Sequence, residues 1–181
     1  MTDDLERIIL SEEDVKEKVR AAAGWLDGRF KGVQTPPLAV CVLKGAALFF
    51  CDLVRAMETP VQLDFLAVSS YGDGTESAGE IKIVCDVSAP VRGRDVILIE
   101  DIVDSGLTLF KLRGLFLGRG AKSFTSVTLL DKPSRRTTAI SADYSCCEIG
   151  DDFVVGYGLD YAQKYRDLPC VGVLKREIYR K

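Results

Sequence analysis

The sequence predicts an α/β protein with a mostly parallel central sheet flanked by helices, and two observations support this prediction. Strand-like and helix-like segments alternate along most of the chain, as they do in proteins built on parallel sheets. The strand-like segments are also almost continuously aliphatic, as in LAVCVL (38–43) and DVILIE (95–100), which is typical of strands covered on both faces. The 181 residues fit one domain with a substantial core, and no linker or internal repeat divides residues 1–181.

In the first half of the chain, apolar periodicity and chain-breaking residues predict two helices and two strands. The first helix opens with a candidate capping box at Ser11 and Asp14, and Thr-Pro-Pro at 35–37 separates it from the next strand. The expected elements are helix 11–30, strand 38–43, helix 44–57 and strand 61–70. The segment YGDGTESAGE that follows contains almost no apolar residue, so we expect a flexible loop at about 70–80.

The second half repeats the alternation with shorter strands. A glycine pair, Gly118 and Gly120, is expected to end a helix, and DKPSRRTTAI (131–140) reads as a polar connection. The expected elements are strands 81–87 and 95–100, a helix near 107–118, strand 123–130, and short strands near 143–148, 153–155 and 170–174.

Composition excludes several classes of function. The chain contains no histidine, so Ser-His-Asp and Cys-His catalysis and His-ligated zinc sites are excluded. Its six cysteines form no CxxC pair, and three of them lie in aliphatic segments, which indicates reduced, packed thiols. A net charge of −3 argues against nucleic-acid binding. The sequence has neither a signal-peptide pattern nor an apolar segment of membrane-spanning length, so we expect a cytoplasmic protein without a membrane partner.

The stretch VILIEDIVDSGLTL (96–109) carries the strongest functional signal. Its aliphatic strand runs into Glu100 and Asp101, and DSGLT (104–108) then leads into a helix, whose free N–H groups favour an anion. Strand alternation would send the two carboxylates to opposite faces, but we expect the strand to stop there, so that both reach one crevice. The alternative interpretation, without a bound ligand, is a solvated acidic loop that caps a helix. A ribose 5-phosphate with Mg²⁺ satisfies both the carboxylates and the phosphate-type turn.

This stretch resembles the phosphoribosyl-pyrophosphate-binding motif of the type I phosphoribosyltransferases. Four further segments resemble signatures of the hypoxanthine-guanine branch of that family, in the family's order: LKGA (43–46), SSYG (69–72), LLDKPSRR (129–136) and DFVVGYGLDYAQKYRDLP (152–169). The resemblance implies the type I phosphoribosyltransferase fold, with a small hood region built from the N-terminal segment and residues of about 150–181. The loop at about 70–80 would close over the active site.

The resemblance also implies an activity. An Mg²⁺-dependent enzyme of purine salvage would transfer the 5-phosphoribosyl group from phosphoribosyl pyrophosphate to N9 of hypoxanthine or guanine. The products would be IMP or GMP and pyrophosphate. The partners would be these small molecules and further copies of the chain, in a homodimer or a homotetramer.

By the same resemblance, the residues after the aliphatic strand would hold the ribose phosphate. Glu100 and Asp101 would bind the ribose hydroxyls and Mg²⁺, and Asp104 would be the general base or acid near N7 of the purine. The 5′-phosphate would be held by Asp104, Ser105, Gly106, Leu107, Thr108 and Leu109. Ser105 stands where Thr is commoner, and Leu107 where many members have Lys; both changes leave the hydroxyl or the amide in place.

The resemblance assigns the base to residues of the second half of the chain. Lys132 would donate to O6, Phe153 would stack on the purine, and the backbone near Val154 and Asp160 would read its N1 and C2 edge. The alternative interpretation of Phe153 is an aromatic residue of the hydrophobic core without a binding role. Arg135 and Arg136 are expected to serve a subunit contact or the solvent.

Pyrophosphate would be bound at the other end of the site. Lys44, Gly45 and Arg166 would contact it, and the Leu43–Lys44 peptide is often cis in the family. Asp160 would hold a second Mg²⁺ there. The alternative interpretation of Arg166 is a solvated charge without a binding role. Ser70 and Tyr71 would lie at the tip of the closing loop.

Two alternatives stay open. The first is an RNA-binding regulator on the same fold that uses phosphoribosyl pyrophosphate as an effector; a basic face and the loss of catalytic groups would favour it. The second is a xanthine-preferring or pyrimidine-specific phosphoribosyltransferase, which a panel of bases separates.

Overall fold

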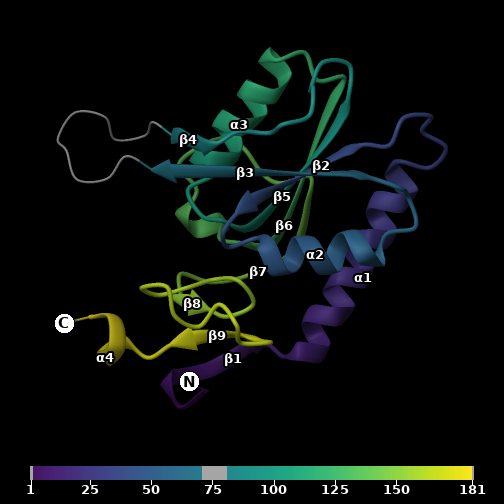
Figure 1. Ribbon diagram of the computed structural model, residues 1–181. Helices are drawn as coiled ribbons and strands as arrows, with labels where there is room; N and C mark the ends of the chain where they lie inside the picture. Colours follow the sequence, from purple (N-terminus) through teal and green to yellow (C-terminus); the bar gives the residue numbers. More distant parts are fainter. Residues whose placement is uncertain (1, 71–80, 181) are drawn as a thin grey trace.

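The protein contains a large sheet of six strands, in the order β4-β3-β2-β5-β6-β7 (Figure 1). The computed structural model describes residues 2–70 and 81–180. All neighbouring strands of this sheet are parallel except β4, which is an antiparallel edge strand paired with β3. The strands are β2 (Leu38–Leu43), β3 (Gln62–Ser70), β4 (Ile81–Cys85), β5 (Asp95–Val103), β6 (Ser123–Asp131) and β7 (Tyr144–Glu148).

Helices cover both faces of this sheet, which explains its continuous aliphatic strands. In Figure 1, α3 (Leu107–Gly118) lies above the sheet, whereas α1 (Glu12–Arg29) and α2 (Ala47–Ala56) lie below it. One core cluster joins α1 and α2 to Ile97 and Ile99 of β5, and another joins α3 to Leu98 of the same strand. The predicted α/β class and the mostly parallel, helix-flanked sheet are confirmed.

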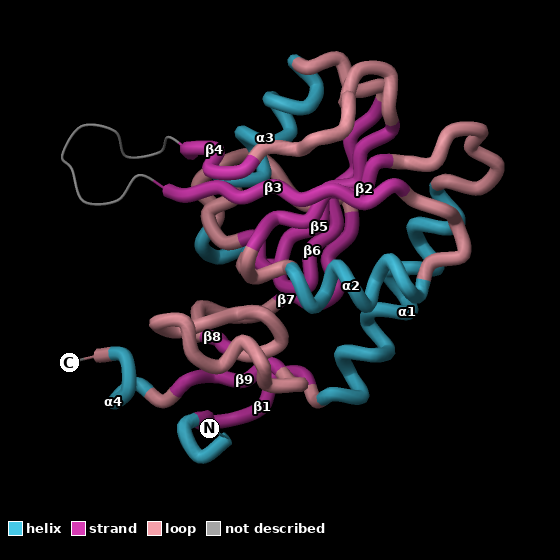
Figure 2. The backbone as a smooth tube through the Cα atoms, in the orientation of Figure 1, coloured by secondary structure: helices cyan, strands magenta, loops and turns pink. Residues whose placement is uncertain are grey.

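A second, smaller sheet connects the two ends of the chain. It contains β1 (Leu5–Leu10), β9 (Val171–Leu174) and β8 (Val154–Val155) in that order, all antiparallel. Figure 2 shows it below the large sheet, with both termini beside it. Short helical turns flank it: η1 (Thr2–Asp4) and α4 (Arg176–Tyr179), while η2 (Pro133–Arg135) follows β6. Its strands come from the N-terminal segment and from residues 154–174, the parts of the chain in which the hood region is expected.

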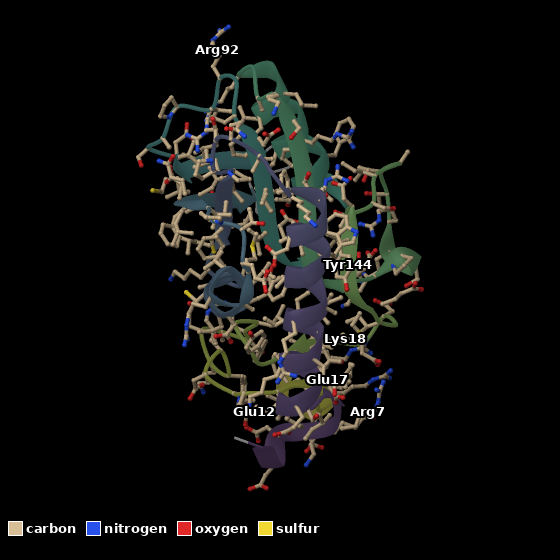
Figure 3. The ribbon with its side chains drawn as sticks, turned by 90° about the vertical axis from the view of Figure 1, so that its right-hand side faces the viewer. Arg7, Glu12, Glu17, Lys18, Arg92 and Tyr144 are labelled. Atoms are coloured by element: carbon tan, nitrogen blue, oxygen red, sulfur yellow. The ribbon has the colours of Figure 1, made fainter. Side chains whose placement is uncertain are left out.

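Helix α1 connects the two sheets. Figure 3 looks onto this helix, which runs from the strand of Arg7 at the bottom past Tyr144 of β7. The rings of Trp25 and Tyr144 lie 5.1 Å apart. The expected capping box is present, because the Ser11 side chain accepts a hydrogen bond from the Asp14 amide while the Asp14 carboxylate accepts one from the Ser11 amide. No helix among the described residues is long and apolar enough to cross a bilayer.

The largest differences from the sequence predictions concern two strands. The sequence analysis did not predict β1, because LERIIL (5–10) is too short to show a hydrophobic period of its own. The strand forms because it pairs with β9 from the far end of the chain. The expectation that the strand at 95–100 stops at Glu100 is wrong: β5 continues to Val103, because Ile102 still pairs with Leu130 of β6. The expected loop at 71–80 lies outside the described residues.

Candidate active site

The residues with expected roles come from segments that meet at one edge of the large sheet. Carboxyl ends of parallel strands share an edge, and ligands of open α/β sheets bind there. β2 leads into Lys44 and Gly45, β5 into Asp104, and β6 into Lys132. The long connection between β8 and β9 of the small sheet adds residues 156–170. The Leu43–Lys44 peptide is cis, as the resemblance implied.

The turn between β5 and α3 forms a small cavity that suits a phosphate group. It measures about 80 Å³ and is lined by the backbone and side chains of residues 102–106 together with Glu100, Thr108 and Leu109. Gly106 is the N-cap of the 12-residue helix α3 and has φ +81°, a conformation that favours glycine. Free N–H groups at this helix end provide donors for an anion. Leu107 does not line the cavity, and its amide hydrogen-bonds to the Ser105 hydroxyl.

The connection after β6 supports this turn from behind. Thr137 and Thr138 both hydrogen-bond to the Ser105 carbonyl. A Cβ on Gly106 would lie 2.5 Å from the Thr138 hydroxyl oxygen, so there is no room for a side chain. The backbone of the turn is therefore held in place before any anion binds.

Glu100 and Asp101 point to different sides of the sheet edge, because β5 runs through both of them. Glu100 lines the small cavity of the turn and is 5% exposed, and its Oε1 has no hydrogen-bond partner. Burial, together with the charge of Asp101, raises the pKa of Glu100 to about 8, while Arg136 acts in the opposite direction. Asp101 lies beside Gly45, and burial raises its pKa as well, against a hydrogen bond from the Ile102 amide.

These two carboxylates fit a hard divalent cation. Carboxylate oxygens are the ligands that Mg²⁺ prefers; the Glu100 Oε1 is buried without a partner, and binding a cation would offset the cost of ionising Glu100. Among the described residues no three or more Asp, Glu, His or Cys side chains form a closed cage. Mg²⁺ is commonly bound by one or two carboxylates together with substrate phosphates, so an open pair of carboxylates is the expected arrangement.

A second group of residues meets around Gly45. A Cβ on Gly45 would lie 1.6 Å from the Asp101 Oδ2 atom, and a Cβ on Gly158 would lie 2.0 Å from the Gly45 carbonyl oxygen. The backbones of the segments that follow β2 and β8 therefore touch here without intervening side chains. Arg166 donates to the Gly158 carbonyl, with Nη1 and O 2.6 Å apart, and its charge reaches Asp101. Lys44 is exposed beside this contact.

Arg166 and Asp160 form an ion pair in this corner, with Nη2 and Oδ1 2.7 Å apart. Both side chains are about one-quarter exposed, so Arg166 is not the fully solvated charge of the alternative interpretation. The Arg166 Nε is buried without a hydrogen-bond partner, and Asp160 also accepts a hydrogen bond from the Gln163 amide. A ligand anion would complete the donor set of Arg166.

A larger cavity of about 380 Å³ lies between the ends of β5 and β6 and the small sheet, a volume suited to a small molecule. Lys132 is 7% exposed and lines it, with Nζ 2.7 Å from the Asp152 carbonyl oxygen. Phe153 is 37% exposed and is not a core aromatic, whereas Val154 is buried. Expected residues that line the cavity are Asp104, Lys132, Phe153, Val154 and Asp160. Asp104 and Ile102 also line the small cavity of the turn after β5, so the two cavities adjoin at these two residues.

Several lining residues were missed by the sequence analysis. Arg135 forms ion pairs with Asp104 and Asp151, with N–O distances of 2.8 and 2.9 Å. Arg136 does not line the cavity; its side chain is 13% exposed and pairs with Asp131, so it does not face the solvent, while a subunit contact stays a prediction. The LLDKPSRR segment contained the signal for both arginines. Tyr179 and Arg180, near the end of the chain, also line the cavity, and no sequence pattern marked them.

The expected tip of the closing loop is described only in part. Ser70 is the last residue of β3, and nothing is described of its side chain. Tyr71 lies outside the described residues.

The fold and the site together define a phosphoribosyltransferase. The family model of the phosphoribosyl transferase domain matches residues 8–162, and the chain belongs to this family. It is 50% identical to a hypoxanthine-guanine phosphoribosyltransferase of Bacillus subtilis over 99% of this chain and 98% of that protein. Within the family the chain therefore lies in the hypoxanthine-guanine branch, whose reaction is a step of purine salvage.

Other relatives agree with this placement. The chain is 50% identical to part of the bifunctional protein TilS/HprT of Listeria innocua, over 99% of this chain but only 27% of that protein. The crystal structure of a hypoxanthine phosphoribosyltransferase from Staphylococcus aureus superimposes with a TM-score of 0.94 at 42% identity, over 100% of this chain and 97% of that one.

Proposed function

We propose that the chain transfers the 5-phosphoribosyl group of phosphoribosyl pyrophosphate to N9 of hypoxanthine or guanine, giving IMP or GMP and pyrophosphate. The observation that supports this best is the meeting of two cavities at Asp104. One is small and lies at a helix N-terminus, and the other is larger, with a buried lysine and an exposed aromatic ring. A ribose 5-phosphate that bridges them would place C1′ beside the base.

The phosphate and the ribose are bound by the end of β5 and the turn after it. The 5′-phosphate accepts hydrogen bonds from the turn of residues 104–109, and the hydroxyls of Ser105 and Thr108 add to the amides there. Glu100 and Asp101 accept hydrogen bonds from the ribose hydroxyls. Asp101 also separates the ribose from the corner where Gly45, Lys44 and Arg166 bind pyrophosphate.

The residues that would hold Mg²⁺ are Glu100 and Asp101, with Asp160 near the pyrophosphate. When bound, the metal supplies positive charge that stabilises the pyrophosphate leaving group. In the absence of the metal, the positive charges that face pyrophosphate are those of Arg166 and Lys44. Asp160 already neutralises part of the charge of Arg166, and a second cation would relieve Arg166 of that partner.

Transfer then requires a bond to form and another to break at C1′. The lone pair of N9 forms the bond to C1′, and the C1′–O bond breaks as its electrons leave with pyrophosphate. The purine ring loses a proton, which the Asp104 carboxylate takes near N7. Lys132 donates to O6 of the purine, and Phe153 stacks on the ring while the backbone at Val154 faces its edge.

We further propose that the loop at 70–80, with Ser70 and Tyr71, closes over the reacting atoms and excludes water. The chain would act as a single domain in a homodimer or homotetramer, without a nucleic-acid partner. We place it in the cytoplasm, because all six of its cysteines are free, as in proteins of reducing compartments. Light scattering of the purified protein measures the number of subunits.

A spectrophotometric assay with phosphoribosyl pyrophosphate, Mg²⁺ and a panel of bases tests the main proposal. We expect turnover of hypoxanthine and guanine, and none of adenine or uracil. Omitting Mg²⁺ and adding a chelator should abolish the reaction. Turnover of xanthine alone, or of uracil, would contradict the base assignment, and no turnover of any base would contradict the reaction itself.

A further inference from the structure

We propose that Tyr179, near the C-terminus, is a positioning residue for the purine: it stacks behind Phe153 and fixes this ring as the platform on which the base lies. The inference rests on the proposed function and specifies how the base is bound. It gives a role to α4, whose Tyr179 lines the cavity but has no function in the proposed reaction.

Three aromatic rings meet at the base cavity. The rings of Phe153 and Tyr179 are stacked, with centroids 4.7 Å apart and planes inclined by 23°. Tyr161 presents its edge to both, at 5.8 Å from Phe153 and 6.5 Å from Tyr179. Offset stacks and edge-to-face contacts of this kind are the favourable arrangements of aromatic pairs. The plane of Phe153 is therefore set by two neighbours.

The spacing decides where a purine can lie. A flat base between two rings needs centroids about 7 Å apart, twice the usual stacking distance, and Phe153 and Tyr179 are closer than that. Phe153 nevertheless stays 37% exposed and lines the cavity together with Lys132. The base therefore stacks on the face of Phe153 that Tyr179 does not cover.

Tyr179 is held firmly enough to serve as this support. Ile178 and Tyr179 pack against a buried cluster that includes Val155 and Leu174 of the small sheet. Just before α4, the Lys175 amide donates to the Asp4 carbonyl at 3.0 Å, and the Lys175 ammonium donates to the Asp3 carbonyl. The C-terminal turn is thus tied to the N-terminal segment, and ordering Tyr179 costs little when the base arrives.

The aromatic pair predicts a specific kinetic effect. Losing one such stack weakens binding by roughly three- to tenfold. We expect Tyr179→Ala to raise the KM for hypoxanthine and guanine about three- to tenfold, because Tyr161 alone then restrains the Phe153 ring. The KM for phosphoribosyl pyrophosphate and kcat should stay within about twofold, since Tyr179 lines the base cavity and not the phosphate turn.

The experiment compares four variants with the wild type. Tyr179→Phe keeps the ring and should restore the wild-type KM for the bases, whereas Tyr179→Leu keeps apolar volume without a ring and should behave like Tyr179→Ala. Glu177→Ala, an exposed residue of the same turn, is the matched control and should change nothing. Circular dichroism and thermal unfolding verify that each variant is folded.

Each result has a defined meaning. An unchanged KM for the bases in Tyr179→Ala and Tyr179→Leu would overturn the inference, as would an equal rise in both KM values, which indicates a structural role. A lower KM for the bases would also overturn it, because Tyr179 would then occupy the place of the purine. A wild-type protein that turns over neither purine would instead contradict the proposed function.

Discussion

The side chain of Asp104 lies where the two cavities adjoin, and Arg135 is its ion-pair partner. We expect Asp104→Asn to lower kcat by roughly 10²–10⁴, because an amide can hydrogen-bond to the purine but cannot take its proton. The KM for phosphoribosyl pyrophosphate should change far less, since the backbone of the turn is held by Thr137 and Thr138. Steady-state kinetics with both substrates provides the measurement. If kcat survives within a few-fold, the proton is taken elsewhere.

Glu100 makes stability depend on pH. Its pKa is about 8 in the folded protein, compared with 4.5 ordinarily, so the folded chain binds more protons than the unfolded chain between these values. The free energy of unfolding therefore falls as the pH rises through this range. Glu100→Gln has no carboxyl group to ionise, so its free energy of unfolding should not fall in this way. The variant should be more stable than the wild type by about 2–4 kcal/mol above pH 8.

Urea unfolding of both proteins with a chelator present, at about pH 5 and about pH 9, tests this expectation. At the lower pH the two proteins should differ little. The expectation would be contradicted if the free energies of unfolding of the wild type and the variant changed with pH by the same amount. Glu100 would then be ionised in the folded protein, with its charge neutralised by Arg136.

Lys132 is expected to select the base. Hypoxanthine and guanine present an acceptor oxygen at C6, whereas adenine presents an amino group that faces the ammonium as donor against donor. Sites built around such a hydrogen bond discriminate by about 10⁴ or more. The side chain of Lys132→Gln can offer an acceptor or a donor. The variant should therefore lose activity with hypoxanthine, and the difference in kcat/KM between hypoxanthine and adenine should become smaller. An unaltered ratio of kcat/KM for the two bases would remove Lys132 from base recognition.

Among the elements, the entry into α3 leaves little freedom at one position. Gly106 combines φ +81° with the absence of space for a Cβ, so Gly106→Ala should lower the free energy of unfolding by roughly 1–3 kcal/mol. The same change should raise the KM for phosphoribosyl pyrophosphate, because the amides of the turn move.

Gly114 of the same helix is the matched control for this substitution. A Cβ there meets nothing within 4 Å, and its backbone is helical, so Gly114→Ala should be neutral or stabilising by about 0.5–1 kcal/mol. Thermal unfolding and substrate titration of both variants test the pair. Equal effects of the two substitutions would show that the turn tolerates a side chain.

At the scale of the whole molecule, the site depends on how the small sheet is attached to the large one. The Tyr157 hydroxyl donates to the Asp52 carboxylate of α2 at 2.7 Å, and burial together with this hydrogen bond raises the pKa of Tyr157. Tyr157→Phe should lower the free energy of unfolding by about 1–2 kcal/mol, because a hydrogen bond to a carboxylate is lost.

Tyr144→Phe is the control for this change. Its ring packs on Trp25, and its hydroxyl has no hydrogen-bond partner within residues 2–70 and 81–180. We expect a change in stability within about 0.5 kcal/mol. Chemical denaturation measures both variants, and equal losses of stability would contradict a specific role of the contact between Tyr157 and Asp52.

Much of the fold and of the site could be predicted because the relevant signals are local. Aliphatic runs and helical spacing predicted β2, β3, β6 and α3 within about a residue or two, since side-chain period is a property of each segment alone. The motif of residues 100–109 predicted a turn at the start of a helix for a similar reason, and residues of this motif line a small cavity. Its carboxylates, glycine and hydroxyls are neighbours in the sequence, and each residue type has a chemical preference that does not depend on distant segments.

The sequence by itself thus determined the class of fold, the family and the local conformation of the turn, whereas the tertiary structure decided which residues pair across long distances in the chain. β1 exists because β9 pairs with it from the other end of the chain, and β5 passes through its two carboxylates because β6 continues beside it. The same holds for the ion pair of Arg135 with Asp104 and for Tyr179 behind Phe153. No local period marks these contacts, because the stabilising partner of each residue is supplied by a segment that only folding brings near.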